Sequence, residues 1–600
     1  MPSSLRNSCP ARQVEMKKNI VFAVLSLIIL FHLVNNYIWL KLDHLFIYPG
    51  FITNTIFHLH NQLVFYQKLK LLLGLDGPFF QKISSFVLLF ESGAVGPQHE
   101  WPVFAYFVTS LANLFFGMTA FVSRFSNSLF MALSVIFTYL IAKECQNKRT
   151  GLIAAFLISF YPAVYGVSRL YDLDFFLIAM TAMVIYFLIR SGNFTRRKYS
   201  ILSGLALGLG ILTKGQIVIF VAGPLIFMFC SILKNAIMKF QGKKEAAHDF
   251  KPRYIFNNIL IFFVLALGVS FVWWGIHFEE KIAILMNHLF AGYFPDKYNL
   301  FGLEFDLWTP RALLFHPLFL VKHVSLPLFL IFCVSLFWLK KKITPDICMV
   351  ILWILAALFI FTLMSAKWEH YCLSLLPAVA ILTGIGVERA GGKIRKVLVF
   401  SILAVSLVQF YYISFGWTGG VLKQPSSGIN FSSTSIYGAL PKKNNYQGIL
   451  AGFSEKIKAG SREKIAEHKV VNVGIIDVID AEINGFLISY YLDLYLQDIR
   501  IWCLPNEDMI IPHSSDFAKY FSDNIDDFDY IIVINNNRQL SLGSENDFDL
   551  PKKFLPGDYY NRIVDNLFNK RRVIEKAVLF PDKKGIYLLS GRALQRNEPS

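Results

Sequence analysis

Ionisable side chains stand beside the ends of four long apolar stretches of this sequence. They are Asp43, Asp172 with Asp174, Lys214, and the group Lys367, Glu369, His370 and Tyr371. Charged groups close to membrane depth are costly and are often functional. A carboxylate there can accept a hydroxyl proton or hold a cation. A lysine, or an arginine such as Arg169, can neutralise a phosphate group.

Any one of these residues also fits a simpler role. A charged side chain at a helix end is commonly an anchor whose head group reaches water from the membrane interface. Chemistry is favoured only if the charged groups meet on one side of the membrane, so the elements that carry them must be oriented first.

Ten apolar blocks, each close to membrane-spanning length, position these groups. They are residues 21–31, 129–141, 151–164, 175–189, 217–232, 259–274, 326–339, 349–364, 373–387 and 397–410. A span needs about 20 mostly apolar residues, and helix is the form that satisfies the backbone in lipid. The chain is 55% hydrophobic and 16% charged. The pattern predicts a polytopic α-helical membrane protein.

Basic residues mark one side of nearly every turn between these blocks, which predicts the cytoplasmic side. Arg6, Arg12, Lys17 and Lys18 precede the first block, and no small-residue cleavage site follows it. We therefore expect an uncleaved first helix, about eleven spans, and an outward C-terminal tail. This topology places all four ionisable groups on the outer side.

The predicted domains follow from this topology. Residues 1–19 form a cytoplasmic N-terminus, and residues 20–415 form the transmembrane domain, with outer loops at 41–125 and 276–320. Residues 416–440 form a linker, and residues 441–600 form an extracytoplasmic α/β domain. In that domain the pattern predicts strands at 470–477, 499–504 and 530–535, helices at 482–496 and 516–525, and a hairpin of 573–580 with 585–589.

Composition argues against two classes of partner. The net charge is +17, but residues 441–600 hold 21 Lys and Arg against 23 Asp and Glu, so the excess lies in the membrane half. No basic stripe with interleaved aromatic residues marks a nucleic-acid surface. The seven cysteines show no zinc-site spacing. The tail carries no glycine-rich nucleotide motif.

Several motifs together resemble a known family. They are WPVFAY from Trp101, SRFS from Ser123, YDLDFF from Tyr171, GLALGLGILTKG from Gly204, and the run SAKWEHY from Ser365 that is followed by Pro377. The chain thus resembles bacterial dolichyl-phosphate-mannose protein mannosyltransferases and lipid A aminoarabinose transferases, over about residues 20–415. These enzymes belong to the C-type glycosyltransferases, which use a polyprenyl-phosphate sugar.

The resemblance implies roles for individual residues. Asp43 would be the first-loop catalytic aspartate and Asp174 the second-loop acid. Lys214 would lie near the donor phosphate, and Lys367 would be the basic residue of the later loop. Glu100 and His288 fall where some relatives hold a metal, so a divalent metal is a candidate cofactor. The chain departs from the family at two positions, with His44 and Trp101 where Glu and Lys are common.

We therefore predict sugar transfer from a polyprenyl-phosphate donor to lipid A, a protein or a glycan at the outer face of the cytoplasmic membrane. Asp43 would act as general base with inversion at the sugar carbon. A transporter or flippase of a lipid-linked glycan is the alternative, but it predicts mid-membrane charges and matching halves, and neither is present. A structural membrane subunit with an outer binding domain is a third possibility.

Overall fold

The computed structural model describes most of the membrane part and the core of the tail. The described residues are 18–42, 52–74, 102–241, 251–275, 297–300, 303–306, 313–340, 343–364, 367–415, 446–467, 471–476, 501–504, 528–535, 571–578 and 585–593, with a few residues between these stretches.

Eight helical stretches within the described residues are long and apolar enough to cross a membrane. They are α1 (Lys18–Leu42), α5 with α6 (Ala120–Phe125, Asn127–Cys145), α9 (Leu173–Ser191), α11 (Ile217–Phe240), α12 (Pro252–Trp274), α17 (Pro345–Leu363), the 3-10 helix η3 with α18 (Glu369–Leu375, Leu376–Ala390), and α19 (Gly392–Phe415). The predicted polytopic helical membrane protein is therefore confirmed.

A bent pair adds a ninth candidate span. Helices α15 (Phe315–Val324) and α16 (Leu326–Leu339) meet at 108°. Ser325 between them has φ 77°, a left-handed conformation that ends α15, and Pro327 in the first turn of α16 starts the next helix. The predicted total of eleven is not reached within the described residues, because α7 (Lys148–Phe160) and α10 (Arg197–Ile211) have only 13 and 15 residues.

The helices that carry Asp174 and His370 are the most enclosed of the candidate spans within the described residues. In α9 and in η3 with α18, 78% and 100% of the best apolar stretch is buried, against 28% in α12 and α19. Next to α9, helix α10 packs closely on α12 through glycines. A Cβ placed on Gly204 would come within 2.6 Å of the carbonyl oxygen of Phe262.

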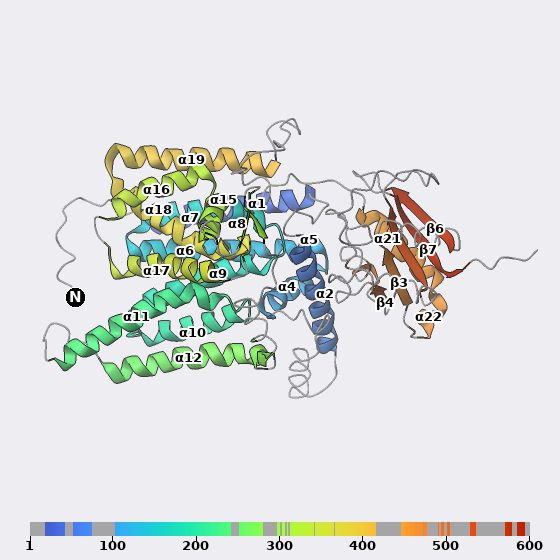
Figure 1. Cartoon of the computed structure of the whole chain (residues 1–600), viewed down its shortest axis with the longest axis horizontal. Coiled ribbons are helices and arrows are strands. Elements are labelled where there is room, and N and C mark those ends of the chain that lie inside the picture. The colour runs from blue at the N-terminus through green and yellow to red at the C-terminus, as the bar shows by residue number, and fades with distance from the viewer. Residues whose placement is uncertain are drawn as a thin grey trace, which may run out of the picture.

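Two further helices lie at one end of the bundle (Figure 1). Helix α2 (Ile52–Gly74) packs against α4 (Phe104–Phe116), and both belong to the predicted outer loop 41–125. Helix α4 is apolar, but its 13 residues are too few to span a membrane. Helix α8 (Pro162–Val167) joins α7 to the start of α9.

The tail contains a five-stranded sheet beyond that end of the bundle (Figure 1), in the order β4-β3-β5-β7-β6. Its strands are β3 (Val471–Ile476), β4 (Ile501–Leu504), β5 (Tyr530–Asn535), β6 (Arg571–Val578) and β7 (Gly585–Ala593). Strand β3 pairs in parallel with β4 and β5, and β7 pairs antiparallel with β5 and β6. The predicted strands and late hairpin are present.

Helices α21 (Tyr446–Gly460) and α22 (Arg462–Ala466) accompany the sheet. Lys464 of α22 pairs with Asp529 at 2.6 Å, and the other oxygen of Asp529 accepts the backbone N–H of Asn472 at 2.9 Å. A short hairpin, β1 (Lys297–Leu300) with β2 (Leu303–Asp306), lies in the predicted loop 276–320. The linker 416–440 and the helix predicted at 516–525 lie outside the described residues, as does most of that predicted at 482–496.

Candidate active site

Two aspartates stand at the start of α9. Asp172 is the N-cap residue, and its Oδ1 accepts a hydrogen bond from the backbone N–H of Asp174 at 2.8 Å. This contact satisfies one of the N–H groups that a helix start leaves without a partner, and the helix dipole favours negative charge there. The first turn of α9 therefore fixes the Asp174 carboxylate in place.

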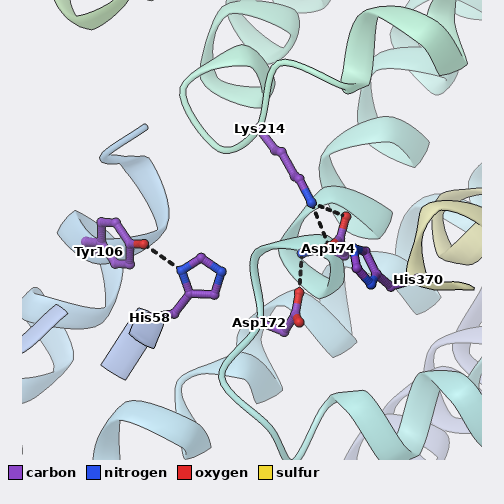
Figure 2. Close-up of polar contacts among 6 residues, drawn as sticks. All are labelled: His58, Tyr106, Asp172, Asp174, Lys214 and His370. Carbon is purple, nitrogen blue, oxygen red and sulfur yellow. Dashed lines mark hydrogen bonds and ion pairs between the residues drawn. The ribbon is translucent and has the colours of Figure 1, made fainter. Parts of the chain in front are cut away.

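Lys214 meets Asp174 from the turn between α10 and α11. Its Nζ donates to both carboxylate oxygens, at 2.9 Å and 2.8 Å (Figure 2). The turn is closed by the backbone N–H of Lys214, which donates to the carbonyl of Gly210 at 2.9 Å. The side chains of Lys214 and Asp174 are only 11% and 5% exposed. Burying both charges has a large desolvation cost. Buried ion pairs at membrane depth are therefore often found at functional sites.

A third segment reaches the same carboxylate. His370 in η3 places its Nε2 3.7 Å from Oδ2 of Asp174 (Figure 2). The neighbouring Tyr371 lies with its ring centroid 5.6 Å from the Nζ of Lys214. Asp174, Lys214, His370 and Tyr371, predicted from separate parts of the sequence, thus lie together.

His58 was not predicted and lies beside this cluster. Its Nδ1 is 2.8 Å from the hydroxyl of Tyr106 in α4 (Figure 2). Burial, and then the positive charge of Lys214, lower the pKa of His58 to about 3, so its imidazole is neutral. The sequence contains a pattern that could have indicated a buried polar helix face here, because Thr55, His58 and Gln62 recur at helical spacing in α2.

Neutral polar side chains continue from His58 along the contact between α2 and α4. Gln62 lies between two serines: its Nε2 is 3.5 Å from Ser110, and its Oε1 accepts from Ser123 at 3.1 Å. Asn113 donates to Ser123 at 3.1 Å. All four side chains are buried. Amide and hydroxyl groups therefore fill the buried contact between α2, α4 and α5.

Two predicted phosphate-binding residues have other contacts. Lys367 donates from Nζ to the carbonyls of Phe361 and Thr362, at 3.0 Å and 2.6 Å, at the C-terminal end of α17. Burial lowers the pKa of Lys367 to about 8. Its ammonium thus caps a helix end, where carbonyls lack partners.

Arg169 is 1% exposed and packs against aromatic rings. Its guanidinium carbon lies 5.1 Å from the ring centroid of Trp39 and 5.5 Å from that of Phe410, and its Nε donates to Oδ1 of Asn36 at 3.1 Å. These contacts join α1 and α19 to the turn before α9. They favour a role in holding that turn.

Three predicted site residues lie outside the described residues, namely Asp43, Glu100 and His288. Within the described part of the chain, no group of three or more His, Cys, Asp or Glu side chains is arranged to hold a metal ion. The proposed metal ligands and the proposed general base therefore remain predictions.

The described residues thus provide an ammonium group, a carboxylate and neutral hydrogen-bonding groups at one buried place. Lys214 can bind an anion, and Asp174 and His370 can orient a polar group beside it. This set of groups suits a substrate that carries an anionic group.

Comparison with known proteins supports this interpretation. The family described as dolichyl-phosphate-mannose-protein mannosyltransferase matches residues 97–242, which include Asp174 and Lys214. A protein of Wigglesworthia glossinidia brevipalpis named undecaprenyl phosphate-alpha-4-amino-4-deoxy-L-arabinose arabinosyl transferase is 24% identical over 50% of this chain and 51% of its own length. The chain spans about half the length of the curated relatives it matches.

The fold is similar over nearly the whole chain. ArnT from Cupriavidus metallidurans in the apo state superposes with a TM-score of 0.56 at 13% identity, covering 94% of this chain and 97% of that one. The form bound to undecaprenyl phosphate gives 0.54 at 14% identity, covering 95% and 98%. The resemblance predicted from the sequence is confirmed: part of the chain matches the mannosyltransferase family, about half of it is similar to named arabinosyl transferases, and its fold is similar to that of ArnT.

Proposed function

We propose that this protein transfers a sugar from a polyprenyl-phosphate donor to an acceptor at the outer face of the cytoplasmic membrane. The observation that carries the proposal is the buried Lys214–Asp174 pair, in a multi-pass fold shared with an undecaprenyl-phosphate-binding protein. A lipid-linked donor explains why the site is built at the ends of membrane helices, since the isoprenoid tail needs an apolar surface.

Lys214 binds the donor phosphate and offsets the charge that develops as the bond between the anomeric carbon and the phosphate oxygen breaks. Asp43 accepts the proton of the acceptor hydroxyl, whose oxygen forms the new bond to the anomeric carbon. Polyprenyl phosphate leaves with the electrons of the broken bond. Attack opposite the leaving phosphate inverts the sugar carbon. Asp174 orients the ammonium of Lys214 through its hydrogen bonds and lies beside the imidazole of His370.

The donor and the acceptor are proposed only by class. The relatives' name points to a lipid-linked pentose, and a lipid-linked hexose is the other sugar class that the proposal admits. The acceptor is lipid A, a protein or another glycan, each of which offers a nucleophilic hydroxyl or phosphate. A divalent metal at Glu100 and His288 would assist phosphate binding.

The proposal also includes a membrane topology for the chain. With the bent pair and with α7 and α10 counted as spans, the chain crosses the membrane eleven times. An N-terminus in the cytoplasm then places the starts of α9 and η3, the turn that carries Lys214, and residues 441–600 outside. Residues 416–440 link the two parts.

Membranes that contain the protein should move label from a radiolabelled polyprenyl-phosphate sugar to a second molecule. Lys214→Ala should reduce this transfer about 10²–10³-fold, the effect of losing one electrostatic contact in a transition state. Asp43→Asn should reduce it about 10²–10⁴-fold, the effect of losing a positioned base.

Arg395→Ala is the matched control, because it removes another basic partner of an ion pair, the 3.1 Å contact with Glu388 at the other end of the bundle. This variant should keep normal transfer. Label that crosses the bilayer without reaching an acceptor, or full transfer by Asp43→Asn at normal expression, would contradict the proposal.

A further inference from the structure

Asp172 has one carboxyl oxygen in use and one without a partner. Oδ1 accepts the backbone N–H of Asp174 at 2.8 Å. Oδ2 is buried and has no hydrogen-bond partner, and the residue is 1% exposed. Buried polar atoms are nearly always hydrogen-bonded, so an orphaned carboxyl oxygen beside a proposed substrate site needs an explanation. Helix capping explains only Oδ1.

The groups around Asp172 come from three other elements. Lys214, from the turn after α10, and Asp174, from its own helix, act on Asp172 through their charges. His370 of η3 contacts Asp174 at 3.7 Å, and His58 of α2 lies on the other side of the cluster (Figure 2). Lys214 already contacts both oxygens of Asp174, so its charge is balanced. An ionised Asp172 would add a second buried negative charge to a site that must receive a phosphate.

Burial, and then the negative charge of Asp174, raise the pKa of Asp172 to about 7. Asp172 therefore keeps a proton up to neutral pH. Since Oδ1 accepts a backbone N–H, the proton belongs on Oδ2. The orphaned acceptor thus becomes a hydrogen-bond donor, which is the kind of group that an anionic phosphate oxygen accepts.

We propose that Asp172 acts as a neutral carboxylic acid whose Oδ2–H donates a hydrogen bond to a phosphate oxygen of the donor, beside Lys214. The proton stays on Asp172 throughout. This inference rests on the proposed function and adds a substrate-contacting residue to it. Binding should weaken as the pH rises and Asp172 ionises, because the donor is lost and a charge that repels phosphate replaces it.

Two substitutions separate this role from helix capping. Asp172→Asn keeps the oxygen that caps α9 and places a permanent N–H donor where Oδ2–H stands. Asp172→Ser keeps a capping oxygen but has no second polar atom. Both variants should fold, as judged by their thermal unfolding.

The experiment measures binding of polyprenyl phosphate to the purified full-length protein between pH 6 and pH 9, together with transfer rates in membranes. In the wild type, affinity should fall about tenfold per pH unit above 7. In Asp172→Asn the affinity should fall less with pH, so that at pH 9 this variant should bind polyprenyl phosphate more tightly than the wild type does. In Asp172→Ser the affinity should be about tenfold lower than in the wild type at pH 6.

The ligand's own ionisation is common to all three proteins, so the comparison between variants isolates Asp172. An Asp172→Ser protein with wild-type affinity and pH dependence, or an Asp172→Asn protein that loses affinity at pH 6, would overturn the inference. The binding assay tests Asp172 even if no transfer occurs. Transfer by a wild type whose pH profile is unchanged in Asp172→Asn would remove the inference and leave the proposed function standing.

Discussion

The ion pair between Lys214 and Asp174 affects both the stability of the protein and its binding of an anionic substrate. Both oxygens of the Asp174 carboxylate contact the Lys214 ammonium, at 2.9 Å and 2.8 Å, so an incoming phosphate would compete with Asp174 for Lys214. Removing one member of a buried ion pair leaves the other charge uncompensated, at a cost of about 3–5 kcal/mol. An anion that binds Lys214 can supply the missing negative charge. A variant that lacks the Asp174 carboxylate should therefore be stabilised by an anionic ligand more than the wild type is.

Asp174→Asn should therefore lower the melting temperature of the purified protein, and polyprenyl phosphate should restore more of it than it adds to the wild type. Differential scanning fluorimetry with and without the lipid measures both effects. Asp529→Asn, which breaks the Lys464 pair in the tail, is the control and should show no extra response to the lipid. An equal lipid-induced shift in Asp174→Asn and wild type would show that Lys214 does not bind the phosphate.

At the residue scale, the sequence predicted which polar groups would meet but not how each would be used. Asp174, Lys214 and His370 converge because each borders an apolar helix on the same predicted side. Arg169 and Lys367 share that side, yet they contact aromatic rings and helix carbonyls. Such choices depend on side-chain packing between distant segments, which spacing along the chain does not encode.

At the scale of elements, the position of Lys214 depends on how closely α10 approaches α12. Gly204 and Gly208 lie one turn apart on α10 and face the backbone of α12, where a Cβ would come within 2.6 Å and 2.9 Å of the carbonyl oxygens of Phe262 and Ala266. Small residues allow this kind of approach between membrane helices. The glycine-rich run therefore positions the turn that presents Lys214.

Gly204→Ala should destabilise the protein by about 1–3 kcal/mol through overpacking, and it should lower transfer by displacing Lys214. The control is Gly268→Ala in α12, where a Cβ meets nothing within 4 Å. Both changes bring the same gain in helix propensity, so their difference isolates the close contact. Thermal unfolding and the transfer assay measure it, and equal behaviour of the two variants would contradict the packing role.

Sequence patterns located elements better than breaks between them. The block predicted at residues 326–339 coincides with α16, and a short apolar run located β5 at Tyr530–Asn535. Helix α15 was missed because its first part, residues 315–320, was assigned to the outer loop 276–320, and its junction with α16 depends on the positive φ of Ser325. Helix α2 was missed because its buried face carries Thr55 and His58, so it lacks the apolar run that indicates a span.

At the scale of the whole molecule, one side of the bundle should face the cytoplasm. Lys143, Lys148, Arg190 and Arg196 lie near the ends of α6, α7, α9 and α10, opposite the end that holds Asp174. Basic residues in short loops predict the cytoplasmic side. The structure gives the positions of the helix ends. The orientation of the bundle in the membrane is predicted only from the distribution of basic residues.

This orientation can be tested by labelling single introduced cysteines in sealed, right-side-out membrane vesicles with a membrane-impermeant maleimide. Lys469→Cys, at an exposed site in the tail, should react before permeabilisation. Lys198→Cys, exposed in the first turn of α10, should react only afterwards, because lipid separates it from the reagent. Reaction is measured relative to the parent chain, which accounts for the native cysteines. If both positions react from the same side, the number of crossings between them is even. Reaction of Lys469→Cys only after permeabilisation would rule out the outer placement of the tail, and reaction of Lys198→Cys before permeabilisation would rule out the outer placement of Lys214 and Asp174.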